Sequence, residues 1–185
     1  WKMGDRLTID SATLIAKGFE VIEARWLFDF PAEAIQVVVH PQSSVHAMVE
    51  FEDGSVMAQV SATDMRMPIQ YALTWPERWP APVPRIDWAQ ARQWEFHEPD
   101  FAKFPLLGLA YESLRTGGAG SCILNAADEV AMAAFLRETI RFSAIARVVE
   151  ETLNRMPFRE PASVAEILEA DGEARWHWGN EGAAA

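Results

Sequence analysis

An anion-binding site is the chemistry that the N-terminal part of the sequence indicates most directly. Asp10 and Ser11 precede a segment with apolar residues at helical spacing, and residues of these two types accept hydrogen bonds from the free amides at a helix start. Lys17 follows in the same segment. A helix N-terminus offers unpaired N–H groups and a positive dipole end, so a hydroxyl and an ammonium group beside it would complete a phosphate site. Capping without any ligand is the alternative reading, since Asp and Ser are common helix caps.

A divalent-cation site is a second possibility in the same segment. Lys17, Glu20 and Glu23 follow one another at intervals of three residues and therefore share one face of a helix. Glu20 would then supply one oxygen ligand to Mg²⁺ or Mn²⁺ while Lys17 holds a substrate anion beside it. The alternative is a solvated charged stripe, because a single carboxylate does not hold a metal and no further ligands are evident nearby.

Three other polar clusters are open to more than one interpretation. The spacing of His40 and His46 fits no metal-ligand set, which favours a buried, hydrogen-bonded pair. The segment 64–68 (DMRMP) is either a ligand loop or a turn with apolar anchors. The segment 124–129 (LNAADE) is typical of capping and packing, with a functional role as the lesser alternative.

The elements that would position these residues begin with a helix and a small sheet. An extended run at 6–9 is expected to lead into an amphipathic helix over 12–28 that ends before Pro31. β-Branched runs then predict strands at 35–39, 45–51 and 55–60, and the Asp53-Gly54 pair predicts a hairpin between the last two. The result would be a helix packed on a small, mostly antiparallel sheet.

The rest of the chain predicts a proline-rich linker and a small helical bundle. Prolines interrupt the chain between Trp75 and Pro105, although the indoles of Trp79, Trp88 and Trp94 suggest that this stretch lies against protein. Helical patterns follow at 106–115, 121–136, 142–156 and 162–169, with a glycine-rich stop at 117–120 and a capping box at 163–166. We therefore expect an α+β protein with a catalytic part at 1–75, a linker at 76–100, a bundle at 101–178 and a frayed tail at 179–185.

Composition narrows the classes of partner and compartment. The 185 residues carry a net charge of -11 with no Lys/Arg cluster, which argues against nucleic acid and against an anionic membrane surface. No apolar run reaches the length of a membrane helix. The single cysteine, Cys122, fits a reducing compartment, and we expect the cytoplasm. Since the sequence starts with Trp1 rather than Met, we expect a fragment.

Several ordered motifs resemble the 1-deoxy-D-xylulose 5-phosphate reductoisomerase family. They are WKMG at 1–4, DSAT at 10–13, KGFEVIEA at 17–24, HPQSSVH at 40–46, DGS at 53–55, DMR at 64–66 with PI at 68–69, and LNAA at 124–127. The resemblance runs to about Asp171 and covers the later part of the family's catalytic domain and its C-terminal helical domain. The family's glycine-rich dinucleotide fingerprint and its Asp-Ser-Glu metal segment are missing. The chain therefore looks like roughly the second half of the enzyme, without the N-terminal NADPH-binding domain.

The resemblance implies a reaction and a set of partners. Members of the family rearrange 1-deoxy-D-xylulose 5-phosphate and reduce the resulting aldehyde with NADPH to 2-C-methyl-D-erythritol 4-phosphate, in non-mevalonate isoprenoid biosynthesis. A divalent cation, Mg²⁺ or Mn²⁺, would act as Lewis acid. The sugar phosphate would be the substrate, and the family resemblance suggests a homodimer.

The resemblance also implies residue roles. Glu20 matches a metal ligand, and Ser11 and Lys17 match residues that hold the substrate. Trp1 and Met3 fall in the flap that covers bound substrate.

Three further matches concern the cofactor and the edge of the site. Gly4 matches a cofactor-contacting glycine, and Met65 matches a methionine placed against the nicotinamide. His46 matches a histidine near the site, with no proton-transfer role that the sequence assigns.

One position departs from the family pattern. Ala16 stands where the family has an asparagine immediately before the lysine, so a hydrogen-bonding amide is lost. Two hypotheses follow: the chain is part of an active reductoisomerase and is inactive alone, or it is a truncated or degenerate relative that serves only as a structural or dimerisation module.

Overall fold

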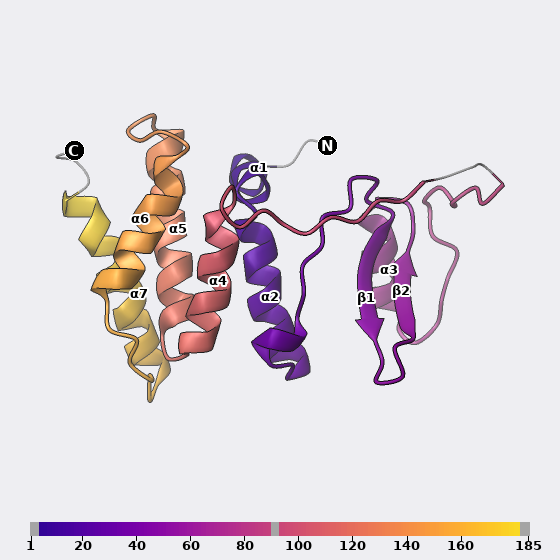
Figure 1. Cartoon of the computed structure of the whole chain (residues 1–185), viewed down its shortest axis with the longest axis horizontal. Coiled ribbons are helices and arrows are strands. Elements are labelled where there is room, and N and C mark those ends of the chain that lie inside the picture. Colours follow the sequence, from indigo (N-terminus) through magenta and orange to yellow (C-terminus); the bar gives the residue numbers. More distant parts are fainter. Residues whose placement is uncertain (1–3, 90–92, 182–185) are drawn as a thin grey trace. The chain divides into compact units, whose positions relative to one another are not determined.

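The computed structural model describes residues 4–89 and 93–181, which belong to two compact units. The first unit joins the chain up to Val37 to the chain from Pro99 onward, and the second is Val38–Glu98. The helices of the first unit are α1 (Asp5–Ala12), α2 (Ile15–Phe28), the 3-10 helix η1 (Ala32–Ala34), α4 (Pro105–Thr116), α5 (Gly120–Leu136), α6 (Ala144–Arg155) and α7 (Val164–Glu181) (Figure 1). The second unit contains β1 (Val45–Glu50), β2 (Val56–Val60) and α3 (Arg66–Thr74). The expected α+β class is confirmed.

Helix α5 is central to the helical unit. It packs against α4, α6 and α7. Small buried residues such as Ala126, Ala127 and Ala131 let these neighbours approach closely, while Ile123 and Leu124 fill the space between them. Burial of this apolar face, rather than helix propensity alone, stabilises the bundle.

The four C-terminal helices lie where the sequence predicted them. Gly117 and Gly118 follow α4 with φ angles of 75° and 56°, which glycine adopts without strain, so the expected stop is confirmed. Ser163 and Glu166 form the expected capping box, since Ser163 Oγ accepts from Glu166 N and Glu166 Oε2 accepts from Ala162 N. Only α7 differs, because it continues well past residue 169 to Glu181.

The N-terminal segment is helical where an extended run was expected. Residues 6–9 lie inside α1, and Asp10 and Ser11 lie near the end of α1 instead of capping the next helix. Helix α2 begins only at Ile15, after Leu14 in the left-handed region with φ 60°. The alternating polarity of 6–9 suggested a strand with one buried face. The segment is instead a helix whose buried residues are Ile9 and the following Asp10.

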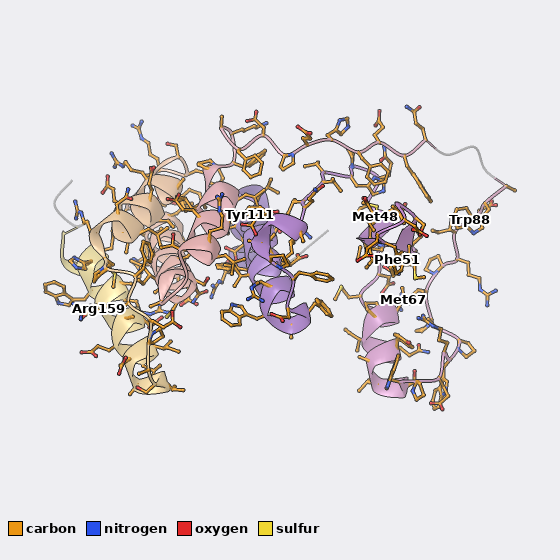
Figure 2. All side chains as sticks on the ribbon, turned by 60° about the horizontal axis from the view of Figure 1, so that its bottom comes forward. Met48, Phe51, Met67, Trp88, Tyr111 and Arg159 are labelled. Atoms are coloured by element: carbon orange, nitrogen blue, oxygen red, sulfur yellow. The ribbon has the colours of Figure 1, made fainter. Side chains whose placement is uncertain are left out.

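The second unit is built around the expected hairpin. Strands β1 and β2 pair antiparallel, and Gly54 takes a φ of 80° in the turn between them. Met48 and Phe51 of this hairpin are exposed (Figure 2). The expected strand at 35–39 is wrong: Val39 makes only an isolated antiparallel bridge to His97.

Over its described residues the proline-rich stretch is irregular, as expected, but two of its indoles are largely exposed. Trp79 and Trp88 are about two-thirds exposed, at 65% and 69%. Trp94 is half-buried and makes edge contacts with Trp88 and His40. Over the described ranges, no helix combines the length and apolarity needed to cross a membrane.

The compact units do not follow the functional boundaries expected at 75/76 and 100/101. Helix α2 packs against α4 of the C-terminal bundle and against α1. The N-terminal helices therefore share a compact unit with the C-terminal helices, and the assignment of substrate binding to residues 1–75 stays a prediction.

Gly18 sets how closely α2 approaches α4. A Cβ at this position would lie 2.6 Å from Ala110 Cβ, well inside van der Waals contact. Both residues are buried. Glycine is therefore required here by packing, and this contact fixes the distance between α2 and α4.

We expect Gly18→Ala to lower the free energy of unfolding of the helical unit by about 1–3 kcal/mol, the usual cost of overpacking. Gly172→Ala is the matched control, because that glycine is also helical but has no atom within 4 Å of the added Cβ. This control should be neutral or stabilising by about 1 kcal/mol. Urea unfolding followed by circular dichroism measures both, and equal effects of the two substitutions would contradict the packing argument.

Candidate functional site

The predicted substrate residues gather at the junction between α1 and α2. Thr13 holds the junction together: its buried hydroxyl donates to Ile9 O at 3.0 Å and lies 3.5 Å from the amide of Ile15. Leu14 adopts the left-handed conformation, which costs about 1–2 kcal/mol for a residue with a Cβ. This turn separates the two helices and leaves the start of α2 open.

The amide-rich helix start is real, but it lies a few residues later than the sequence suggested. The first α-helical bond of α2 runs from Gly18 N to Leu14 O at 3.2 Å. The amides of Ala16 and Lys17 precede that bond and have no intrahelical acceptor. These two N–H groups and the positive end of the helix dipole make this end of α2 suitable for an anion.

Ser11 is exposed on the preceding helix. Its Oγ donates to Leu7 O at 2.7 Å, a common arrangement for serine inside a helix. The hydroxyl oxygen keeps its lone pairs as acceptors. To donate to a bound anion, Ser11 would have to exchange its bond to Leu7.

Lys17 and Glu20 form an ion pair with each other. Lys17 Nζ and Glu20 Oε2 are 2.6 Å apart, and the two side chains are 43% and 58% exposed. Pairs of this kind on a helix surface contribute only about 0.2–0.5 kcal/mol. A phosphate could therefore bind the Lys17 ammonium, and a cation could bind the Glu20 carboxylate, with little energy lost from breaking their ion pair.

Ala16 contributes only its backbone amide to this surface. Its methyl group neither donates nor accepts a hydrogen bond. Because Ala16 stands where the family resemblance places an asparagine, the start of α2 has one hydrogen-bonding side chain fewer.

Three other predicted site residues differ in their surroundings. Gly4 caps the start of α1, and its carbonyl accepts from the amide and the hydroxyl of Thr8, both at 3.1 Å. In the second unit, His46 is exposed and its Nε2 lies 3.2 Å from Ser61 O, while Met65 is 68% exposed. Trp1 and Met3 lie outside the described residues.

The two histidines are not a mutually bonded, buried pair. His40 is half-buried, stacks on Phe96 with ring centroids 4.5 Å apart, and places Nδ1 2.9 Å from Glu95 O. Its bonds, like those of His46, are to backbone carbonyls. Within the described residues no three His, Cys, Asp or Glu side chains are grouped to hold a metal ion, and the role of Glu20 as a metal ligand stays a prediction.

The segment at 64–68 is a helix start. Asp64 Oδ1 accepts from the backbone amide of Arg66 at 3.0 Å, and the Arg66 side chain binds the same carboxylate. These hydrogen bonds lower the pKa of Asp64 to about 2. Helix α3 follows directly, with Met65 at its start.

A charged cluster that the sequence interpretation missed fixes α1 to the bundle. Arg6 of α1 binds Glu129 of α5 at 2.9 Å and lies 3.5 Å from Asp10. Arg175 of α7 binds Glu129 at 2.8 Å. Burial opposes ionisation of Glu129, but the bonds from the two arginines outweigh it and lower the pKa of this carboxyl. The signal was present in the i,i+4 spacing of Arg6 and Asp10, which is informative only if 5–12 is helical.

Asp128 is the least expected member of this cluster. Its side chain is fully buried in α5, and neither carboxylate oxygen has a hydrogen-bond partner within the described chain. Burial, followed by the nearby charge of Asp10, raises the pKa of Asp128 to about 7. Burial also raises the pKa of Asp10, whose Oδ1 is likewise buried and unpartnered.

Comparison with known proteins defines the class to which this fold and this junction belong. Residues 60–177 match the DXP reductoisomerase C-terminal domain family, and residues 1–28 match the 1-deoxy-D-xylulose 5-phosphate reductoisomerase C-terminal domain. The chain belongs to the DXP reductoisomerase C-terminal domain family.

Individual relatives agree with this assignment. The 1-deoxy-D-xylulose 5-phosphate reductoisomerase of Solibacter usitatus is 66% identical over 175 residues, which are 95% of this chain and 44% of the relative. The enzyme of Thermodesulfovibrio yellowstonii is 51% identical over 95% of this chain and 46% of its own length. The chain thus spans somewhat less than half the length of the relatives it matches.

Solved structures give the same result. The Zymomonas mobilis reductoisomerase in complex with NADPH superimposes with a TM-score of 0.91 at 43% identity, over 97% of this chain and 48% of that one. A DOX-P reductoisomerase with fosmidomycin and magnesium gives a TM-score of 0.86 at 38% identity, over 97% of this chain and 47% of that one.

The protonation of Asp128 predicts an unusual pH dependence of stability. Because its pKa is raised from 3.8 in the unfolded chain to about 7, the group stabilises the fold below about pH 4, and this contribution is lost as the pH rises to 7. The loss is about 4 kcal/mol at most, since one pKa unit corresponds to about 1.4 kcal/mol. Asp128→Asn should therefore flatten the pH dependence of the free energy of unfolding between pH 4 and 8 and stabilise the protein at pH 8.

Urea unfolding of the 185-residue chain at several pH values measures this difference. Asp64→Asn is the control, because Asp64 has a pKa of about 2 and is ionised throughout the window. A wild-type stability that does not fall between pH 5 and 8 relative to Asp128→Asn would contradict the assignment.

Proposed function

We propose that this chain is the C-terminal part of an NADPH- and divalent-cation-dependent reductoisomerase that converts 1-deoxy-D-xylulose 5-phosphate to 2-C-methyl-D-erythritol 4-phosphate. The observation that carries the proposal is the open start of α2 in a chain of this family, with Ser11, Lys17 and the amides of residues 16 and 17 at one junction. The family's named relatives supply the reaction.

In this proposal the junction binds the sugar phosphate. The free amides of α2 and its dipole stabilise the phosphate, Lys17 adds a full positive charge, and Ser11 donates its hydroxyl after releasing Leu7 O. Binding would cost little, because the ion pair that Lys17 gives up is exposed and weak.

Glu20 would hold one corner of a divalent cation, Mg²⁺ or Mn²⁺. A carboxylate released from Lys17 is the hard oxygen ligand that such ions prefer. The remaining ligands would come from the part of the protein that this chain does not include. Such a cation would supply Lewis acidity at the substrate oxygens, and the neighbours solved with magnesium support Mg²⁺ in this role.

The family resemblance assigns further residues to the cofactor and to the lid. Met65 would contact the nicotinamide of NADPH, since its thioether is exposed and polarisable. Gly4 would line the cofactor at the start of α1, and His46 would border the site. Trp1 and Met3 would form the apolar flap that excludes water from the aldehyde.

The proposed protein is a cytoplasmic homodimer. The hairpin of the second unit presents exposed apolar side chains, including Met48, Val49 and Met57, which a partner surface would cover. The single free cysteine, Cys122, is compatible with a reducing compartment.

A structural or dimerisation role without turnover is the second candidate, and Ala16 is the observation that favours it. Truncating a side chain that hydrogen-bonds a charged partner costs about 1.5–3 kcal/mol. That loss corresponds to about ten- to a hundred-fold in transition-state binding.

We expect Ser11→Ala and Lys17→Ala each to lower kcat/KM by about ten- to a hundred-fold, from the loss of one charge-assisted bond. The assay uses a chimera in which this chain replaces the matching part of the Solibacter usitatus enzyme and follows NADPH oxidation with the sugar phosphate. Lys103→Ala is the charge-matched control, since Lys103 lies over the ring of Phe104 in the stretch before α4. Equal effects of the Lys17 and Lys103 substitutions would refute the proposed site.

Ala16→Asn in the same chimera should raise kcat/KM by up to about a hundred-fold, because it returns an amide beside the phosphate. Ala165→Asn serves as the control, at an exposed position of α7 outside the junction. Unchanged kinetics of Ala16→Asn would show that another group, or water, already fills this role.

A further inference from the structure

The buried carboxyl group of Asp128 lies in a cluster with an imbalance of charge. Arg6 and Arg175 face the carboxyl groups of Asp10, Asp128, Glu129 and Asp171, through the ion pairs and electrostatic contacts that link α1, α5 and α7. Two positive charges thus meet four acidic groups. One bound proton would reduce the excess negative charge from two to one.

The unpartnered atoms show where that proton belongs. Glu129 accepts from both arginines, and Asp171 accepts from Arg175 at 2.7 Å, so both are best ionised. The orphaned oxygens are Oδ1 of Asp10 and both oxygens of Asp128. A buried carboxylate without a donor is costly, whereas a carboxylic acid donates its own O–H.

Asp10 connects this cluster to the substrate junction. Helix α1 has only eight residues, and its buried positions are Ile9 and Asp10. Ser11 is the next residue, so the placement of its hydroxyl follows the placement of Asp10. Whatever holds the Asp10 carboxyl therefore holds the end of α1 that faces the proposed phosphate.

We propose that Asp128 is a positioning residue that, as a neutral carboxylic acid, donates to the Asp10 carboxylate and keeps Ser11 in place for the substrate phosphate. The inference rests on the proposed function for its consequence on substrate binding, whereas the proposed hydrogen bond between Asp128 and Asp10 rests on the burial of both groups, their unpartnered oxygens and their shared neighbour Arg6. The helical bundle is then part of the substrate site, although Asp128 touches no substrate.

The charges around Asp128 define how this contact responds to pH. Asp10 and Arg6 act from α1 and Glu129 acts from the same helix, while Arg175 of α7 acts on the cluster through Glu129. Burial and the Asp10 charge raise the pKa of Asp128 to about 7, against the opposing effect of Arg6. Raising the pH through 7 therefore removes the proton and loosens the end of α1.

The first test measures α1 directly in the 185-residue chain. Hydrogen exchange of the α1 amides, corrected for intrinsic rates, should lose protection by about tenfold or more between pH 6 and 8 in the wild type. Asp128→Asn keeps an N–H donor without a titrating proton and should stay protected at both pH values. Asp128→Leu should be poorly protected at both. Protection that does not depend on Asp128 would overturn the inference.

The second test measures substrate binding in the Solibacter usitatus chimera. Asp128→Leu should raise KM for the sugar phosphate by about tenfold, and Asp128→Asn should keep it within about twofold while removing the rise in KM above pH 7. Val149→Ala, a fully buried truncation on α6, is the stability control and should lower the active fraction without changing KM. Equal KM values for Asp128→Leu and Val149→Ala would overturn the positioning role.

The two proposals fail in different ways. A wild-type chimera that does not turn over the sugar phosphate contradicts the proposed function, whereas the exchange experiment still decides the contact between Asp128 and Asp10. A chimera that turns over while α1 exchange ignores Asp128 contradicts only the inference made here.

Discussion

The close packing of α2 on α4 is the constraint on which the rest of the site depends. At Gly18 the two helices approach so nearly that a methyl group does not fit, and Ala110 forms the opposing surface. This contact fixes which face of α2 is buried, and Lys17 and Glu20 therefore lie at the surface. Because α2 belongs to the same compact unit as the bundle, the C-terminal helices support the proposed phosphate site directly.

Much of the helical unit could be predicted from the sequence because its signals are local. Glycines with positive φ follow α4, and the Ser163 and Glu166 side chains bond where a capping box requires. Helix α7 was predicted too short: it continues past residue 169 to Glu181, and the Asp171–Arg175 ion pair spans Gly172 within it. The hairpin was recognised from the Asp53-Gly54 turn for the same local reason.

Helix α1 and the charged cluster could not be predicted, because their causes are distant in sequence. Arg6 and Glu129 are 123 residues apart, and their ion pair helps to hold a segment whose polarity alternates as in a strand. The burial of Asp128 follows from three helices packing around α5, which no pattern within 124–129 records. The same limit applied to the candidate site. Its residues were predicted by resemblance, but the start of the helix that carries Lys17 was placed several residues too early.

The central claim is that the start of α2, together with Ser11 and Lys17, binds the substrate phosphate while Glu20 binds the cation. A crystal structure of the Solibacter usitatus chimera with 1-deoxy-D-xylulose 5-phosphate and Mg²⁺ tests this claim most directly. The account predicts the phosphate within hydrogen-bonding distance of Ser11 Oγ, Lys17 Nζ and the first amides of α2, with Glu20 coordinating Mg²⁺. A phosphate bound elsewhere, with these three side chains facing solvent, would contradict it.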